Sequence, residues 1–135
     1  MSFHVTTNTD PFDLPWLCEM LKGSYWGHGL TDEKIAKALE HSVNFWIHEY
    51  EGPDVTPVGF ARVVSDHAIF SSLMDVIIDP KYRRRGHGKK LMQAVIEHAA
   101  VRETICVIST RDACRFYNKF GFQTFHGILM QRNPS

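Results

Sequence analysis

The chain has 135 residues, which suits one domain over residues 1–135 and leaves little room for a second. Apolar residues make up 44% and charged residues 22%, so disordered, collagenous and fibrous classes are excluded. Three cysteines without metal-ligand spacing favour a reducing compartment over a disulfide framework. With neither a signal-peptide pattern nor an apolar run of about 20 residues, we expect a cytoplasmic protein without membrane attachment.

The net charge is zero, but the charges are unevenly placed along the chain. Residues 1–80 hold four basic and twelve acidic residues, a net charge of −8. Residues 81–135 hold eleven basic and three acidic residues, a net charge of +8. Six of those bases lie between Lys81 and Lys90, a stretch without any acid. This concentration indicates a site for an anion.

The first 42 residues predict a short strand and two helices. Phe3 to Thr7 reads as the strand. Asp13 followed by Pro15 predicts a helix start, and Gly23 predicts its end. Thr31, followed by two acids, predicts the start of a second helix. An aromatic and glycine-rich loop, residues 24–29, lies between the two helices.

The rest of the chain predicts further strands and two more helices. Short turns separate three strands, which indicates an antiparallel meander over residues 44–51, 58–65 and 68–78. An amphipathic helix is expected around residues 91–99, and a short strand over 104–108. Ser109-x-x-Asp112 resembles a capping box for a helix that Gly121 ends, and residues 122–130 predict a last strand. The fold class is therefore α/β (α+β), with a mixed, mostly antiparallel central sheet and helices on both faces.

The segment Asp75-Val-Ile-Ile-Asp-Pro-Lys-Tyr-Arg-Arg-Arg-Gly-His-Gly-Lys-Lys-Leu91 joins an apolar strand to an amphipathic helix through a basic loop. Unpaired N–H groups at a helix N-terminus bind anions, and Gly86 and Gly88 allow a ligand to approach the backbone closely. The segment lacks the P-loop pattern, and Leu91 stands where a dinucleotide motif needs its third glycine. The residues therefore predict a polyphosphate site of another kind.

This segment resembles the coenzyme A loop of the GNAT superfamily of N-acetyltransferases, whose pattern [Arg/Gln]-x-x-Gly-x-[Gly/Ala] is met by Arg83, Gly86 and Gly88. A second family motif, Tyr-x-x-x-Gly-Phe, is met by Tyr117 and Gly121-Phe122. The resemblance spans about residues 44–130 and is to small, single-domain, bacterial-type members. It implies a GNAT-like acyl-CoA N-acyltransferase fold and direct transfer of an acetyl group from acetyl-CoA to an amine.

The resemblance also implies where acetyl-CoA binds. The backbone of the basic loop would hold the pyrophosphate, and the preceding strand would pair with the pantetheine arm. The implied cofactor-binding residues are Val76, Ile77, Ile78, Arg83, Arg84, Arg85, Gly86, His87, Gly88, Lys89, Thr110 and Asn118. Thr110 stands where many relatives carry Asn, so a hydroxyl would replace the amide. We expect the His87 side chain to face solvent.

Two residues are the candidates for proton transfer. Asp75, among apolar neighbours, would be desolvated and become a stronger base, or it would bind the substrate ammonium group. Glu49, His28 and His67 are weaker candidates for the base. By resemblance, Tyr117 is the general acid that protonates the departing thiolate, because a phenol has a pKa near 10 against about 8.5 for a thiol. Each could instead be purely structural.

Aromatic residues of the first half are candidates for the acceptor side: Tyr25, Trp26, His28 and Phe45. Core packing explains Trp26 and Phe45 equally well. The acceptor is expected to be a primary amine of a small molecule or peptide, and the eight scattered histidines predict no metal. One alternative is a catalytically silent acyl-CoA-binding sensor. Another, disfavoured by the lack of stacking aromatics, is a nucleic-acid-binding domain that uses Lys81–Lys90. Monomer and homodimer both stay open.

Overall fold

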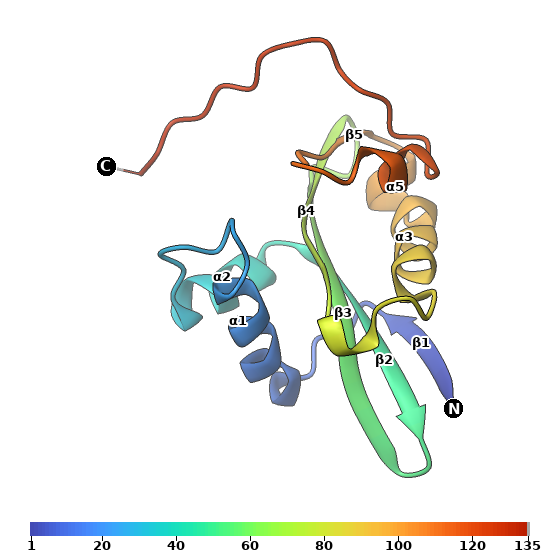
Figure 1. Cartoon of the computed structure of the whole chain (residues 1–135). Coiled ribbons are helices and arrows are strands. Elements are labelled where there is room, and N and C mark those ends of the chain that lie inside the picture. The colour runs from blue at the N-terminus through green and yellow to red at the C-terminus, as the bar shows by residue number, and fades with distance from the viewer. Residues whose placement is uncertain (135) are drawn as a thin grey trace.

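The computed structural model describes residues 1–134 and centres on a five-stranded sheet (Figure 1). The strand order along the sheet is the chain order: β1 (Ser2–Thr6), β2 (Val43–Glu51), β3 (Asp54–Ser65), β4 (Phe70–Ile78) and β5 (Ile105–Val107). Neighbouring strands are antiparallel except β4 and β5, which are parallel. The predicted meander and the mixed, mostly antiparallel sheet are thereby confirmed.

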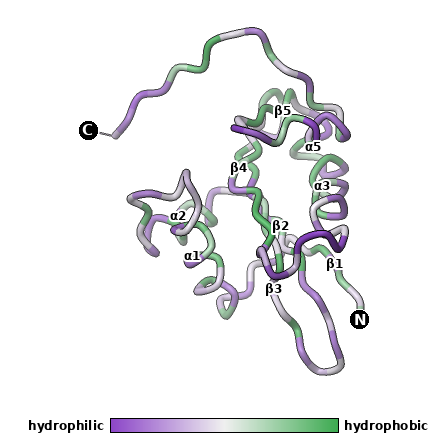
Figure 2. Tube along the Cα trace, viewed as in Figure 1, coloured by the Kyte–Doolittle hydropathy of each residue, from purple (hydrophilic) through white to green (hydrophobic). Residues whose placement is uncertain are grey.

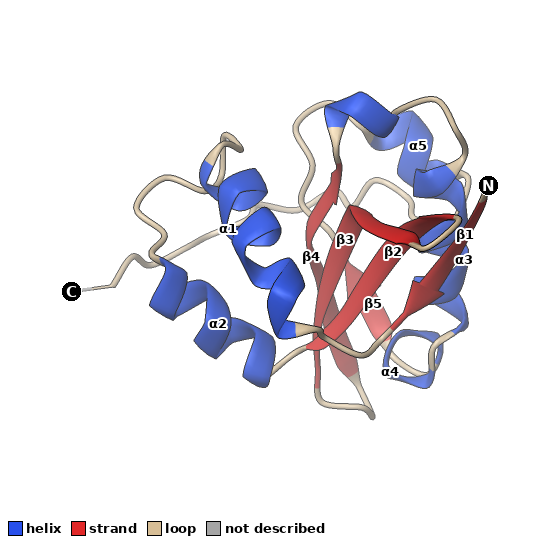
Figure 3. Ribbon diagram, turned by 90° about the horizontal axis from the view of Figure 1, so that it is seen from below, coloured by secondary structure: helices blue, strands red, loops and turns tan. Residues whose placement is uncertain are grey.

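Helices cover both faces of this sheet, as predicted (Figure 3). One face carries α1 (Leu14–Lys22) and α2 (Asp32–Glu40), and the other carries α3 (His87–Glu97), α4 (Ala99–Arg102) and α5 (Cys114–Asn118). Two short 3₁₀ turns precede α1 and α3, at Pro11–Asp13 and Pro80–Tyr82. None of the helices in residues 1–134 has the length and apolar character that crossing a bilayer requires.

Each face of the sheet has its own apolar core, because successive side chains of a strand point to opposite faces. On β2, Phe45 packs in the core under α3, whereas its neighbour Trp46 packs in the core under α1 and α2. On β3, Ala61 and Phe60 divide in the same way. The central strands β2 and β3 are therefore buried on both faces.

The predicted helix starts are correct only in part. Thr31 caps α2, since its side-chain oxygen accepts a hydrogen bond from the Lys34 N–H at 3.2 Å. Asp13 precedes α1 without capping it, because its carboxylate is 2.7 Å from His48 Nε2. The Ser109-x-x-Asp112 capping box is wrong: α5 begins at Cys114. The hydroxyl of Thr110 instead accepts from the Ala113 N–H.

The predicted last strand over residues 122–130 is also wrong. The chain after Phe122 runs extended and clear of the body (Figure 1). The last backbone hydrogen bond before it, from the Phe122 N–H to the Tyr117 carbonyl at 3.3 Å, ties it to the end of α5. Strand geometry needs a neighbouring strand to pair with, and within residues 1–134 this segment has none.

Candidate active site

The site is built where β4 separates from β5. The two strands pair only from Phe70 to Ser72 of β4, so the stretch from Leu73 to Ile78 has an open edge on that side. A bulge lies within the open stretch: Asp75 and Val76 together face Ala61 of β3. Asp75 adopts a left-handed backbone conformation with φ of 56°. The open edge confirms that the strand splays after Leu73, and it leaves Val76, Ile77 and Ile78 free to pair with an extended ligand.

The basic loop follows directly and opens α3. Arg84 and Gly86 are both left-handed, with φ of 65° and 83°, and this turns the loop tightly into the helix. Within residues 1–134, none of the backbone N–H groups of residues 84–89 donates a hydrogen bond. The loop is also among the most hydrophilic stretches of the chain (Figure 2). These donors and the positive end of the helix dipole make a cradle for phosphate.

Gly88 is needed in the first turn of α3 for a packing reason. A Cβ atom at this position would meet the Phe116 ring at 3.3 Å and Ile78 at 4.0 Å. The missing side chain therefore lets α3 approach both α5 and the end of β4. It brings the phosphate cradle and the open edge of β4 together.

The expectation that His87 faces solvent is wrong. Its side chain is 1% exposed, and Nε2 lies 2.7 Å from Oε1 of Glu49 on β2. The same carboxylate accepts a hydrogen bond from Arg85 at 3.1 Å. Glu49 is itself buried, so a carboxylate taken from water is satisfied by two partners from the loop. Only the backbone of His87 is available to a phosphate. Glu49 therefore anchors the basic loop to β2 through these two contacts.

Asp75 is fixed by two side chains from other elements. Arg62 Nε donates to Oδ2 at 2.7 Å, and Trp26 Nε1 donates to Oδ1 at 3.0 Å. Arg62 also donates to Ser42 at 3.2 Å, and both members of the ion pair are largely buried. The carboxylate is thus surrounded by donors as well as by apolar strand residues. It joins β3, β4 and the loop after α1.

Tyr117 lies on α5 and is 8% exposed, in the core under α3. Burial, and secondarily the nearby Tyr25 phenol, raises the pKa of Tyr117 to about 12, so its hydroxyl keeps its proton at neutral pH. Asn118, the next residue, is exposed at the end of α5. Thr110 Oγ1 accepts a hydrogen bond from the Ala113 N–H at the start of α5, which leaves its hydroxyl hydrogen and one lone pair for a ligand.

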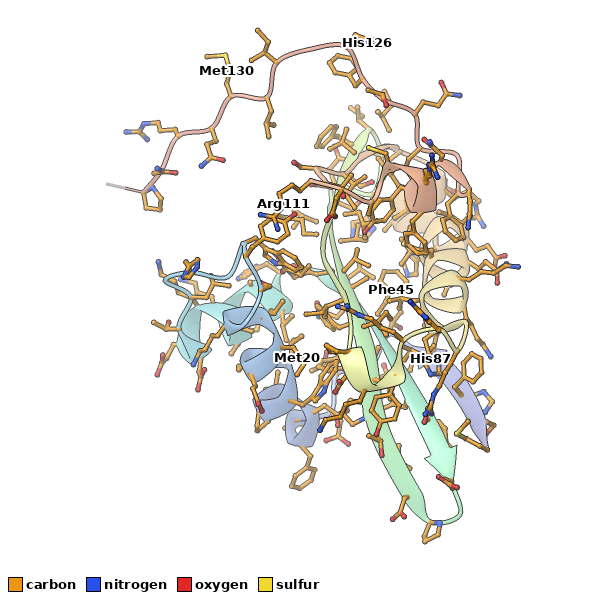
Figure 4. All side chains as sticks on the ribbon, in the orientation of Figure 1. Met20, Phe45, His87, Arg111, His126 and Met130 are labelled. Atoms are coloured by element: carbon orange, nitrogen blue, oxygen red, sulfur yellow. The ribbon has the colours of Figure 1, made fainter. Side chains whose placement is uncertain are left out.

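The loop after α1 carries two of the predicted acceptor-side residues to Asp75. Tyr25 and Trp26 are half exposed, and their rings meet edge to face with centroids 4.9 Å apart. The guanidinium of Arg111 lies 3.8 Å from the centre of the Tyr25 ring, beside this loop (Figure 4). His28 is exposed on the same loop.

The prediction that Phe45 lies on the acceptor side is wrong. It is 1% exposed, packs in the core under α3 and meets the His98 ring edge to face at 5.4 Å. A side chain this deep in the core supports the sheet and does not line an open site. His67, a weaker base candidate, lies in the β3–β4 turn, outside the residues that surround Asp75.

Three residues of the site were missed or misassigned from sequence. Arg62 is opposite Met74 in the β3–β4 register, one residue before Asp75, so a correct hairpin alignment could have found it. Glu49 and Arg111 meet their partners only through tertiary packing. No local pattern marks those contacts.

Comparison with known proteins identifies the family. The family model described as an acetyltransferase (GNAT) domain matches residues 41–124, more than half of the chain. The chain belongs to the GNAT family of acetyltransferases.

Individual relatives of known name support the same family assignment. The chain is 31% identical over 120 residues to the uncharacterized N-acetyltransferase ycf52 of Porphyra purpurea, covering 87% of this chain and 67% of that one. It spans 53% and 49% of the length of two relatives from Glycine max. A crystal structure of a GNAT-family protein from Xanthomonas campestris superposes with a TM-score of 0.87 at 30% identity, covering 99% of this chain and 94% of that one.

The present chain also superposes on AAC(6')-Iy, whose structure was determined in complex with the bisubstrate analogue CoA-S-monomethyl-acetylneamine. The TM-score is 0.73 at 18% identity over the full length of both chains, a likeness of fold alone. In the present chain, the residues fit coenzyme A on their own geometry. The unpaired N–H groups of residues 84–89 suit a pyrophosphate, and the open edge of β4 suits an extended amide-containing arm.

Proposed function

We propose that this chain transfers an acetyl group from acetyl-CoA directly to a primary amine of a small molecule or peptide. The proposal rests on two sets of unpaired backbone groups that adjoin each other in the chain. The unpaired N–H groups of residues 84–89 follow directly after the open edge of β4. One continuous segment therefore offers donors for a pyrophosphate and a strand edge for a pantetheine arm.

Acetyl-CoA would supply the acetyl thioester, and the chain supplies orientation and polarisation. The cradle at the start of α3 fixes the phosphate end, with Arg83 and Arg84 exposed beside it. Backbone N–H groups along Val76–Ile78 on the free edge are placed to donate to a carbonyl oxygen as negative charge develops on it. Acetylation of an amine forms the N–C bond and breaks the C–S bond, which releases a thiolate that needs a proton.

Two side chains have separate roles in this proposal, one as a proton donor and one in orienting the amine. Tyr117 donates its phenolic proton to the departing thiolate, because it remains protonated throughout the physiological range. Asp75 orients the incoming amine. Each carboxylate oxygen already accepts one hydrogen bond, from Arg62 or from Trp26, and keeps a lone pair for an N–H donor of the amine. The amine then loses its proton to water.

The test combines binding with turnover. Acetyl-CoA should raise the melting temperature, and thiol should be released when amines, polyamines, amino acids or peptides are supplied. Arg83→Glu with Arg84→Glu should weaken acetyl-CoA binding at least tenfold, because two cations become anions beside the phosphates. Lys34→Glu with Lys37→Glu, a pair of the same charge change on α2, is the matched control and should bind normally.

The possible failures have distinct meanings. If acetyl-CoA does not bind, the proposal is wrong. If acetyl-CoA binds and no amine in the panel is acetylated, the chain is an acyl-CoA-binding module of the sensor type. Equal binding by the Arg83/Arg84 and Lys34/Lys37 variants would mean that the phosphates lie elsewhere.

A further inference from the structure

One arginine on the acceptor side of the site has no acidic partner within residues 1–134. Arg111 lies between β5 and α5 and is exposed, and its guanidinium carbon is 3.8 Å from the centre of the Tyr25 ring. It forms no ion pair with any carboxylate of those residues. Arg62, by contrast, is paired with Asp75. The positive charge of Arg111 is therefore available to a ligand.

The contact with Tyr25 fixes Arg111 without using up its hydrogen-bond donors. A cation–π contact holds the guanidinium over the ring and gives its N–H groups no acceptor oxygen. Tyr25 is 50% exposed, so a dissolved ligand can reach this part of the surface. The planar fork of N–H donors matches the two oxygens of a carboxylate.

Arg111 and Asp75 stand at the two ends of one aromatic pair. Trp26 Nε1 donates to Asp75 Oδ1 at 3.0 Å, the Trp26 and Tyr25 ring centres are 4.9 Å apart, and Arg111 lies over the Tyr25 ring. The acid comes from β4 and the base from the segment after β5, the two strands between which the opening lies. Figure 4 shows Arg111 reaching toward the loop after α1. The site thus offers one charge of each sign across two aromatic rings.

The charges around this aromatic pair are not balanced. Asp75 is one acid against two bases, Arg62 and Arg111, so this side of the site carries a net positive charge. An acceptor that brought only an ammonium group would add to that excess. An acceptor that also carries a carboxylate would balance it, and the charges of ligand and site would then be complementary.

We propose that the acceptor is an amino acid with its amine at the far end of an extended apolar chain, and that Arg111 selects it by binding its carboxylate. Asp75 orients the amine, so the inference rests on the proposed function. Because two rings separate the two charges, the amine and the carboxylate have to be several bonds apart. The methylene groups between them pack on Tyr25 and Trp26, which are 50% and 40% exposed in the free chain.

Acetylation of ε-aminocaproate and of its amide tests the inference, because the amide keeps the amine and the chain length and loses only the negative charge. The kcat/KM of the wild type should be about tenfold or more higher for the acid. In Arg111→Gln this preference should fall toward one. Arg111→Lys should keep part of it, because the charge remains and the planar fork is lost.

The matched control is Arg115→Gln, the same charge change on an exposed residue of α5, and it should keep the full preference. A loop that shifts because Arg111→Gln lacks the contact with Tyr25 would slow both amines alike. The ratio of the two kcat/KM values therefore separates selection of the carboxylate from a purely structural role.

A binding measurement without turnover separates this inference from the proposed function. ε-Aminocaproate is titrated into the ¹⁵N-labelled chain, with and without coenzyme A, and the indole N–H signal of Trp26 reports binding because that group bonds to Asp75. The dissociation constant should be about tenfold or more higher in Arg111→Gln than in the wild type. Arg115→Gln should bind like the wild type.

The outcomes that contradict the inference differ from those that contradict acetyl transfer. Equal kcat/KM for the acid and the amide, or a preference that Arg111→Gln leaves intact, would overturn the inference while acetyl transfer stands. If no amine is acetylated, the proposed function is wrong and the titration decides the inference alone. Lack of ε-aminocaproate binding, or equal binding by the wild type and Arg111→Gln, would then overturn it.

Discussion

Burial keeps the phenol of Tyr117, the proposed general acid, in its protonated form. A donor to a thiolate must be protonated at working pH and must reach the site, and Tyr117 meets the first condition because burial raises its pKa to about 12. The motif position predicts Tyr117 as the acid, and that role stays a prediction. The sequence could not predict the size of the pKa change, which depends on the packing of α5 against α3 and on the nearby Tyr25.

Tyr117→Phe should lower kcat by roughly 100-fold or more while acetyl-CoA binding stays unchanged, because the variant keeps the ring and loses the proton donor. A raised pKa means that the acid form is active below about pH 12 and is lost only above it. The wild-type pH–rate profile should therefore show no alkaline limb from this residue up to pH 10. An unaltered kcat in the variant would remove Tyr117 from the mechanism. A limb near pH 9 that the substitution abolishes would contradict the raised pKa of Tyr117.

Asp75 shows what the sequence predicted well and what it missed. An acid in an otherwise apolar strand stands out, and the structure places it at the bulge of β4. Its left-handed backbone is tolerated because Asp adopts this conformation more readily than most residues. Its partners, Arg62 and Trp26, are 13 and 49 residues away, so only the tertiary fold could reveal them.

At the scale of elements, strand β2 holds the basic loop before α3 in place through one carboxylate. Glu49 contacts His87 at the start of α3 and Arg85 in the loop before it. This arrangement couples the central sheet to a loop whose own backbone is strained at Arg84. Sequence reasoning considered Glu49 as a base and expected His87 to be exposed, because neither position carries a local signal of burial.

Glu49→Ala should raise the KM for acetyl-CoA several-fold and leave kcat within about twofold, since the loop loses its anchor and the reacting groups do not change. The free energy of unfolding should fall by about 1–3 kcal/mol, the usual cost of leaving a buried polar partner unpaired. Glu51→Ala, an exposed acid two residues further along β2, is the control. A variant that is less stable but has an unchanged KM would reduce Glu49 to a purely structural role.

The order of strands and helices could largely be predicted because periodicity and turn residues are local signals. Element ends were less predictable: the capping box Ser109-x-x-Asp112 predicts a helix that begins directly after Ser109, whereas α5 starts at Cys114. The prediction of a last strand over residues 122–130 was wrong for a different reason. An apolar run such as Ile128–Met130 indicates burial, but it does not indicate whether the covering surface belongs to the same chain.

At the scale of the molecule, the opposite charges of the two halves are partly joined inside the fold. Glu49 of the acidic half binds Arg85 and His87 of the basic half, and Asp75 is neutralised by Arg62. The exposed remainder of the basic run is gathered at the start of α3, beside the free edge of β4 (Figure 2). The zero net charge therefore conceals one concentrated cationic site that suits a polyphosphate.

Backbone amide shifts in a ¹⁵N-labelled chain titrated with acetyl-CoA test this account most directly, since the amides themselves are the proposed ligands. The largest changes should fall on residues 84–89 and on Val76–Ile78. Residues of α2 and of the β2–β3 turn should be unaffected. Shifts confined to other surfaces, or no shifts at saturating acetyl-CoA, would contradict the central claim that the free edge of β4 and the start of α3 form a coenzyme A site.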